Sequence, residues 1–120
     1  MAGVEGRVAL VTGAGRGIGK VTAELLASRG ARVMAVARSE EQLKTLGFEF
    51  VAADLGTACG CALAVEEMKK RRGPADILVC NHGLGSAHER VIWEQDPDLW
   101  RESIHVNLDG PFYLSQLVVK

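Results

Sequence analysis

Residues 8–19 read Val8-Ala9-Leu10-Val11-Thr12-Gly13-Ala14-Gly15-Arg16-Gly17-Ile18-Gly19, an apolar run followed directly by a glycine-rich stretch. The apolar run is typical of a strand that is covered on both faces. Glycines allow unusual backbone angles and a close approach to a ligand, and the N–H groups at the start of a following helix bind phosphate. The stretch therefore predicts a strand, a phosphate-binding turn and a helix.

The spacing of these glycines excludes two common phosphate-binding motifs. A P-loop requires glycine at position 14 and Ser or Thr at position 21, where this chain has Ala14 and Val21. The dinucleotide pattern G-x-G-x-x-G finds no match from either Gly13 or Gly15. The spacing that fits is G-x-x-x-G-x-G, over residues 13–19.

Outward from this stretch, short apolar runs alternate with segments of helical periodicity. We predict strands at Val8–Val11, Val33–Ala37, 48–53 and Ile77–Cys80, the third of them an edge strand. We predict helices from 18 to about Arg29-Gly30, at 40–46, at 57–72, and from Asp96-Pro97 to the C-terminus with a kink at Gly110-Pro111. In the first helix, one face carries Ile18, Val21, Thr22, Leu25 and Leu26. The β-α-β-α-β-α-β-α order predicts an α/β fold, a parallel sheet with helices on its faces.

The composition excludes several classes of protein. The 120 residues carry a net charge of −1 with a pI near 6.3, so neither a nucleic-acid nor a membrane-surface partner is expected. No apolar run in the sequence approaches the roughly 18 residues of a membrane span. Cys59, Cys61 and Cys80 lack metal-ligand spacing, so we expect no metal, free thiols and a cytoplasmic location.

The residues after the second predicted strand indicate the type of cofactor. A site for NAD would place Asp or Glu about 20 residues after the glycines. This chain has Arg38-Ser39 there, nineteen positions after Gly19. Because a guanidinium binds phosphate bidentately, Arg16 and Arg38 could bracket a 2′-phosphate, which favours NADP(H) over NAD(H). The alternative is that both arginines are solvated surface residues.

Four motifs in this order resemble the classical short-chain dehydrogenase/reductase family. They are T-G-x-x-x-G-I-G at 12–19, Asp54-Leu55, Cys80-Asn81-His82-Gly83 and Val106-Asn107. The resemblance implies a three-layer Rossmann-type doubly wound parallel sheet with strand order 3-2-1-4, the cofactor-binding half of a larger fold, over residues 1–120. With the two arginines, the expected cofactor-binding residues are Thr12, Gly13, Gly15, Arg16, Gly17, Ile18, Gly19, Arg38, Ser39, Asp54, Leu55, Asn81, His82 and Gly83.

The resemblance also implies an activity. Family members transfer hydride between a nicotinamide cofactor and a small carbonyl or alcohol, so we expect an NADP(H)-dependent oxidoreductase, similar to a 3-oxoacyl reductase. Asn107 matches the asparagine of the family's catalytic tetrad. The family further implies that the full-length form is a homo-oligomer, a dimer or a tetramer.

Two features depart from the family pattern. His82 stands where the family has a small alanine, and it either packs or touches the cofactor. The family's catalytic serine and its Y-x-x-x-K pair find no match, since Tyr113 is followed by Leu117 four residues later and is expected to pack. A truncated, inactive form that binds nucleotide, or pairs with a full-length relative, is therefore the alternative function.

The absent second half would leave apolar surface uncovered. We expect the fourth strand to be an unprotected edge and the last helix to expose Trp100, Leu108, Phe112 and Leu117. The segment Gly83–Gln95 borders the expected substrate pocket, with His88, Glu89 and Trp93 as candidates or as parts of a solvated loop. His105 is expected on the helix surface.

Overall fold

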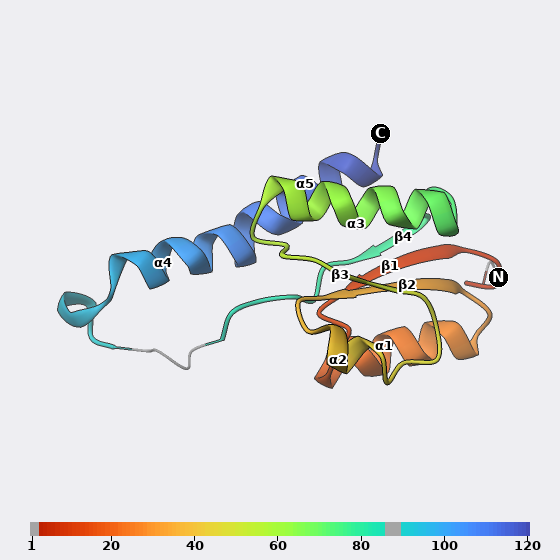
Figure 1. Cartoon of the computed structure of the whole chain (residues 1–120), viewed down its shortest axis with the longest axis horizontal. Coiled ribbons are helices and arrows are strands. Elements are labelled where there is room, and N and C mark those ends of the chain that lie inside the picture. Colours follow the sequence, from red (N-terminus) through yellow and green to blue (C-terminus); the bar gives the residue numbers. More distant parts are fainter. Residues whose placement is uncertain (1–2, 86–89) are drawn as a thin grey trace.

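Four parallel strands form one sheet in the order β3-β2-β1-β4 (Figure 1). The computed structural model describes residues 3–85 and 90–120. Its strands are β1 (Val8–Thr12), β2 (Arg32–Ala37), β3 (Phe50–Ala52) and β4 (Ile77–Val79). In the central register, Leu10 pairs with Met34 on one side and with Leu78 on the other. The predicted strand order is confirmed.

Helices cover both faces of the sheet and complete the three predicted layers (Figure 1). One face carries α1 (Gly17–Ser28) and α2 (Glu40–Leu43). The opposite face carries α3 (Ala58–Arg71) and α5 (Gly110–Val118), which pack against each other. Between β4 and α5 lie a 3-10 turn, η1 (Ile92–Glu94), the helix α4 (Pro97–Ile104) and a π-helical turn, η2 (His105–Asp109).

Alternate residues of each strand point into two apolar cores, one on each face of the sheet. On the α3–α5 side, Leu10 and Met34 pack with Val65, Met68 and Leu114. On the α1–α2 side, the neighbouring strand residues meet small side chains of α1 and Leu43 of α2. Burial of both strand faces explains why β1 reads as a continuous apolar run.

Helix α1 does not bury the face that its apolar periodicity indicates. Ile18, Val21 and Leu25 are exposed, whereas Gly19 and Ala23 are buried. Small side chains bring the helix axis close to the sheet. Ile18, Val21 and Leu25 therefore point away from β1 and β2, whereas Leu26 is half-buried and packs against the core on this side.

Several predicted boundaries differ from the observed ones. The second helix spans four residues rather than 40–46, and β3 is three residues long rather than 48–53. Asp96 caps α4 as predicted, since its Oδ1 accepts from the Asp98 N–H at 2.8 Å. A kink is predicted at Gly110-Pro111, and in the structure the π-helical turn η2 ends directly before Gly110. π-Bulges are one of the known causes of helix kinks.

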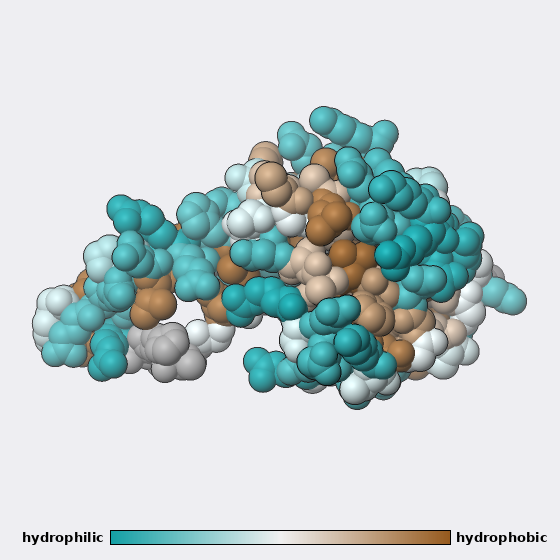
Figure 2. All heavy atoms as spheres, in the orientation of Figure 1, coloured by the Kyte–Doolittle hydropathy of each residue, from teal (hydrophilic) through white to brown (hydrophobic). Residues whose placement is uncertain are grey.

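Apolar side chains are exposed along the α4–α5 segment, as Figure 2 shows for α4. Trp100, Leu108 and Phe112 are each more than half exposed, in agreement with the prediction. Leu117 differs, because it packs beside Tyr113 against the core on the α3–α5 side. Tyr113 is thus a packing residue.

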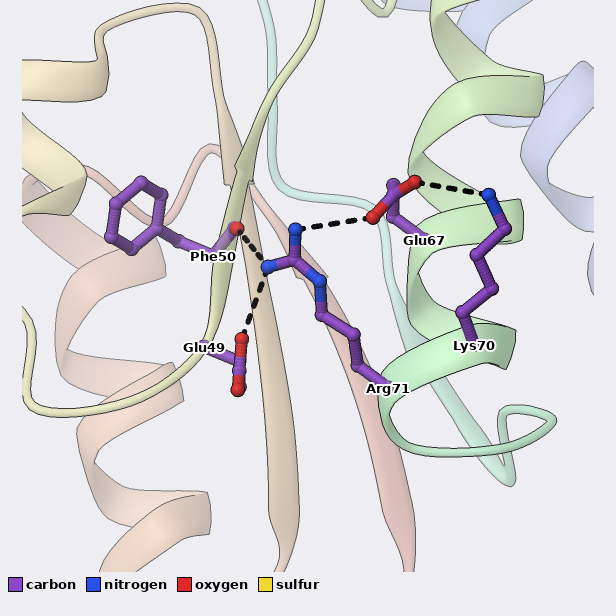
Figure 3. Close-up of polar contacts among 5 residues, drawn as sticks. All are labelled: Glu49, Phe50, Glu67, Lys70 and Arg71. Carbon is purple, nitrogen blue, oxygen red and sulfur yellow. Dashed lines mark hydrogen bonds and ion pairs between the residues drawn. The ribbon is translucent and has the colours of Figure 1, made fainter.

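The edge strand β3 is tied to the end of α3 by Arg71 (Figure 3). Its Nη1 lies 3.1 Å from Oε2 of Glu49 and donates to the carbonyl of Phe50 at 3.4 Å. Its Nη2 lies 3.1 Å from Oε2 of Glu67, which also pairs with Lys70. Arg71 therefore binds the Phe50 carbonyl, which lies on a sheet edge that would otherwise be open to strand pairing. At the other edge of the described sheet, β4 pairs with β1 alone.

Within residues 3–85 and 90–120, no helix combines the length and the apolar character needed to cross a membrane.

Candidate functional site

A pocket of about 610 Å³ opens at the carboxyl ends of the strands. In a parallel sheet, this end is where ligands bind, near the point at which the strand order reverses. Here the reversal lies between β1 and β4. The lining residues are Gly13, Gly15, Arg16, Gly17, Ile18, Ala37, Arg38, Ser39, Gln42, Ala53, Asp54, Leu55, Gly56, Asn81, His82, Gly83, Leu84 and Val106.

The glycine-rich turn leaves the start of α1 open toward this pocket. Gly17 has a φ of +58°, a conformation that L side chains rarely adopt. A Cβ at Gly19 would collide with the carbonyl oxygen of Gly13, so the turn closes only around glycine. Among the described residues, no side chain caps the start of the helix at Arg16. The first N–H groups of α1 are therefore available to an anion.

The two arginines that we expect at a 2′-phosphate, Arg16 and Arg38, both line the pocket. Arg16 precedes α1, and Arg38 follows β2. The guanidinium of Arg38 lies 3.9 Å from Oε1 of Glu102 on α4. Ser39 also lines the pocket, but its Oγ caps α2 by accepting from the Gln42 N–H at 3.4 Å.

Another part of the wall comes from the turn after β3, the strand beside β2. Oδ1 of Asp54 accepts from the Gly56 N–H at 2.9 Å, which folds the chain back toward α3. A Cβ at Gly56 would lie 3.0 Å from Cγ2 of Val106, so the turn and η2 are in close contact. Leu55 is 4% exposed and presents an apolar floor. This part of the wall can accept a flat apolar ring against Leu55, with the Asp54 carboxylate beside the ring.

The hydroxyl of Thr12 joins the end of β1 to the loop after β4. It is fully buried, donates to the Val79 carbonyl at 3.2 Å, and accepts from the N–H groups of Asn81 and His82 at 3.0 and 3.2 Å. Neither Thr12 nor Gly19 lines the pocket. Both instead hold the pocket-forming turns together. The Asn81 amide donates to the Gly13 carbonyl at 3.4 Å and links the same two turns.

His82 both packs and borders the pocket. Its Nδ1 lies 2.7 Å from Oγ1 of Thr12, and its Nε2 is buried without a well-formed hydrogen bond within the described residues. A Cβ at Gly110 would lie 2.7 Å from Nε2, so the ring fills the space under the α5 start. Burial lowers the pKa of His82, against a smaller opposing effect of the Val106 backbone. The half-buried ring therefore favours the neutral form.

Asn107 lies in the π-helical turn rather than on the pocket wall. Its Oδ1 accepts from the Leu84 N–H at 2.7 Å, and its Nδ2 donates to the Leu84 carbonyl at 3.3 Å and to Oγ of Ser103 at 3.1 Å. The side chain thus holds the loop that follows Gly83. π-Helical turns occur often at functional sites.

The sequence missed several lining residues. They are Ala37, Gln42, Ala53, Gly56, Leu84 and Val106. Among the substrate-pocket candidates, His88 and Glu89 lie outside the described residues, and Trp93 is 80% exposed and does not line the pocket. His105 is on the helix surface as predicted, with Nδ1 2.8 Å from Oδ2 of Asp109.

The three cysteines are free thiols. Burial, with smaller effects of Asp54 and Cys80, raises the pKa of Cys61 to about 11, so its thiol is protonated at neutral pH. Burial also raises the pKa of Cys80. In the part of the chain that the structure describes, no cluster of three or more His, Cys, Asp or Glu side chains could hold a metal ion.

The parallel sheet, the open start of α1 and the pocket at the strand ends define a Rossmann-type nucleotide-binding unit. The model of the short chain dehydrogenase family matches residues 7–120, and the chain belongs to this family.

Known proteins agree with this assignment. The chain is 34% identical over 122 residues to the 3-oxoacyl-(acyl-carrier-protein) reductase FabG of Escherichia coli (strain K12). The aligned region covers 97% of this chain and 49% of the relative. It is 39% identical over 123 residues to L-xylulose reductase of Cavia porcellus, covering 98% and 48%. The chain thus spans about half the length of these curated relatives.

Solved structures show the same fold. A metagenomic short-chain oxidoreductase in complex with NADP superposes with a TM-score of 0.89 at 34% identity, covering 98% of this chain and 57% of that chain. L-Sorbose reductase from Gluconobacter frateurii, complexed with NADPH and L-sorbose, gives a TM-score of 0.88 at 32% identity, covering 98% and 48%.

Proposed function

We propose that residues 1–120 form the NADP(H)-binding portion of an oxidoreductase that transfers hydride between nicotinamide and a small carbonyl or alcohol, as a 3-oxoacyl reductase does. One observation carries the proposal: the open start of α1 and two arginines, Arg16 and Arg38, line a single pocket at the strand ends. The similar structures in complex with NADP and NADPH support the same cofactor. NAD(H) is the alternative cofactor.

Each part of the pocket has a chemical role in this proposal. The N–H groups at the start of α1 bind the pyrophosphate, because a helix N-terminus favours negative charge. Arg16 and Arg38 bind the 2′-phosphate, and Asp54 with Leu55 holds the adenine. Asn81, His82 and Gly83 border the rest of the cofactor. The bound cofactor supplies or accepts the hydride.

Asn107 is the residue to which we assign a part in proton transfer. Its support is the match to the family's tetrad asparagine and its place in the π-helical turn. Its side-chain hydrogen bonds to Leu84 place it beside the loop that borders the pocket. We further propose a homo-oligomeric full-length form, through the exposed Trp100, Leu108 and Phe112, in the cytoplasm.

The cofactor assignment is tested by Arg38→Asp. We expect this variant to lose most of the preference for NADPH over NADH, about 10- to 1,000-fold, because one or two charged hydrogen bonds of about 1.5–3 kcal/mol each are lost. Dissociation constants for both nucleotides measure the effect. Arg32→Asp makes the same charge change at the other end of β2 and serves as the control. An unchanged ratio for Arg38→Asp would contradict the assignment.

Turnover is a separate measurement. Residues 1–120 carry no match to the family's serine and Tyr-x-x-x-Lys pair, so turnover is expected only of a full-length form that supplies them. In that form, oxidation of NADPH in the presence of a 3-oxoacyl ester, followed by absorbance, is the expected result. If that form turned over none of a panel of carbonyl compounds, the proposed activity would be contradicted and the cofactor assignment would stand.

A further inference from the structure

An acidic residue faces the arginine that we assign to the 2′-phosphate. Oε1 of Glu102 on α4 lies 3.9 Å from Nη1 of Arg38 at the end of β2. The two side chains are 49% and 62% exposed, so both are accessible to solvent. Arg38 lines the pocket, and Glu102 reaches it from α4. At this distance the pair is an ion pair without a direct hydrogen bond. Such exposed pairs are weak and easily exchanged.

Glu102 lies one helical turn before a residue of the pocket wall. Val106 lies four residues further along and therefore on about the same side of the helix. Val106 is buried, lines the pocket and closely approaches Gly56 in the turn after β3. Val106 thus holds the turn that follows Glu102 at the pocket, and the Glu102 carboxylate lies beside Arg38 of the pocket wall.

The carboxylate and a ribose 2′-phosphate would require the same guanidinium. A phosphate monoester carries about −1.5 to −2 charges at neutral pH and accepts two parallel hydrogen bonds from arginine. It would therefore displace the single charge of Glu102 from Arg38. The displaced carboxylate would still lie close to the phosphate, as a like charge. A ribose with a free 2′-OH would neither need to displace Glu102 from Arg38 nor be repelled by its carboxylate.

We propose that Glu102 is a specificity-determining residue, which limits the preference of this pocket for a 2′-phosphorylated nucleotide by competing for Arg38 and repelling the phosphate. The inference rests on the proposed function, since it assigns Arg38 to the 2′-phosphate. It goes further by giving an opposing role to a residue of α4 that none of the cofactor motifs contains. The balance between Arg38 and Glu102 then sets how far NADP(H) is favoured over NAD(H).

The test is Glu102→Gln in the full chain, with dissociation constants for NADPH and NADH. We expect NADPH to bind about three- to tenfold more tightly and NADH to change by less than about twofold, from one unit charge removed near an exposed phosphate. The gain should shrink as salt is added, because exposed charges are screened. Adenosine 2′,5′-bisphosphate and 5′-AMP should repeat the difference, because they differ only in the 2′-phosphate.

Glu66→Gln is the matched control, because it removes the same charge from an exposed position on α3 that does not line the pocket. It should leave both constants unchanged. Weaker or unchanged NADPH binding by Glu102→Gln would overturn the inference, and so would an equal gain for NADPH and NADH.

Arg38→Asp separates this inference from the proposed function. If Arg38→Asp abolishes the preference for NADPH but Glu102→Gln does not raise it, only the role of Glu102 fails. If Arg38→Asp leaves the preference unchanged, the 2′-phosphate assignment fails and the role of Glu102 fails with it.

Discussion

The Thr12 hydroxyl oxygen lies 2.7 Å from Nδ1 of His82, so a side chain at the end of β1 directly contacts the loop after β4. The same oxygen accepts hydrogen bonds from the backbone N–H groups of Asn81 and His82. One buried hydroxyl therefore sets how the two pocket-forming turns lie relative to each other.

Thr12→Val should destabilise the fold by about 2–3 kcal/mol, because it leaves two backbone N–H groups without a buried acceptor. Thr12→Ser keeps the hydroxyl and should lower the free energy of unfolding by only about 1 kcal/mol, because one buried methyl group is removed. Denaturant unfolding measures both values. Equal losses for the two variants would show that the hydroxyl contributes nothing beyond packing.

The free energy of unfolding should fall as the pH drops below about 6.5, the usual pKa of histidine. Burial lowers the pKa of His82 in the folded state, so the unfolded chain binds more protons between the two pKa values, and stability rises with pH there. The slope should approach about 1.4 kcal/mol per pH unit and vanish below the folded-state pKa. His82→Asn keeps a polar atom near Thr12 and should remove this contribution, as seen in unfolding curves at several pH values.

His105→Asn is the control for the pH experiment, because His105 is exposed on η2. The pH dependence should persist in this variant. If it disappears here and remains in His82→Asn, then burial of His82 is not its cause.

Asn107→Ala should release the loop after Gly83, since three hydrogen bonds from its side chain are lost. We expect a loss of about 1–2 kcal/mol and faster hydrogen exchange at the Leu84 amide. Asn107→Asp keeps the Oδ1 acceptor and should protect that amide better. If hydrogen exchange at the Leu84 amide were unchanged in Asn107→Ala, the hydrogen bond from this amide to Oδ1 of Asn107 would be contradicted.

Arg71→Met should increase hydrogen exchange along β3 and lower stability by about 1 kcal/mol, because the Phe50 carbonyl loses its partner and two exposed ion pairs disappear. Lys70→Met removes an ion pair with Glu67 but no contact with β3, so exchange along β3 should stay as in the parent chain. Equal exchange in both variants would argue against a role for Arg71 at this edge.

Phe112→Glu should reduce self-association, because Phe112 is 61% exposed beside the other apolar residues of the α4–α5 segment. Sedimentation velocity over a range of protein concentrations measures the effect. Phe112→Leu keeps an apolar side chain and should associate like the parent chain. If the parent chain sediments as a monomer throughout, this surface does not bring copies of the chain together.

The strands, the parallel sheet and the place of the pocket could be predicted because they depend on local signals, whereas the strand order was implied by the family resemblance. The apolar run before Gly13, the glycine spacing and Asp96-Pro97 each act within a few residues of the chain. The cofactor motifs lie at strand ends, and parallel strands bring their carboxyl ends to one edge. Most of the predicted cofactor residues therefore line one pocket.

The errors arose where distant segments decide the outcome. Ile18, Val21 and Leu25 share one face of α1, yet the sheet accepts the face with Gly19 and Ala23. Periodicity detects an apolar stripe on a helix, but it does not show how closely the helix must approach the sheet in order to pack. Val106 lines the pocket because η2 approaches Gly56, a contact between residues fifty positions apart in the sequence.

By itself the sequence determined the parallel sheet, the phosphate-binding turn and the family, because propensity, glycine spacing and motif order are local properties of the chain. Only the tertiary structure decided that Thr12 joins two turns, that the half-buried His82 packs beneath Gly110 and that Glu102 faces Arg38. Each of these contacts joins segments more than twenty residues apart. Their geometry follows from how the helices settle on the sheet, and no local pattern of residues encodes it.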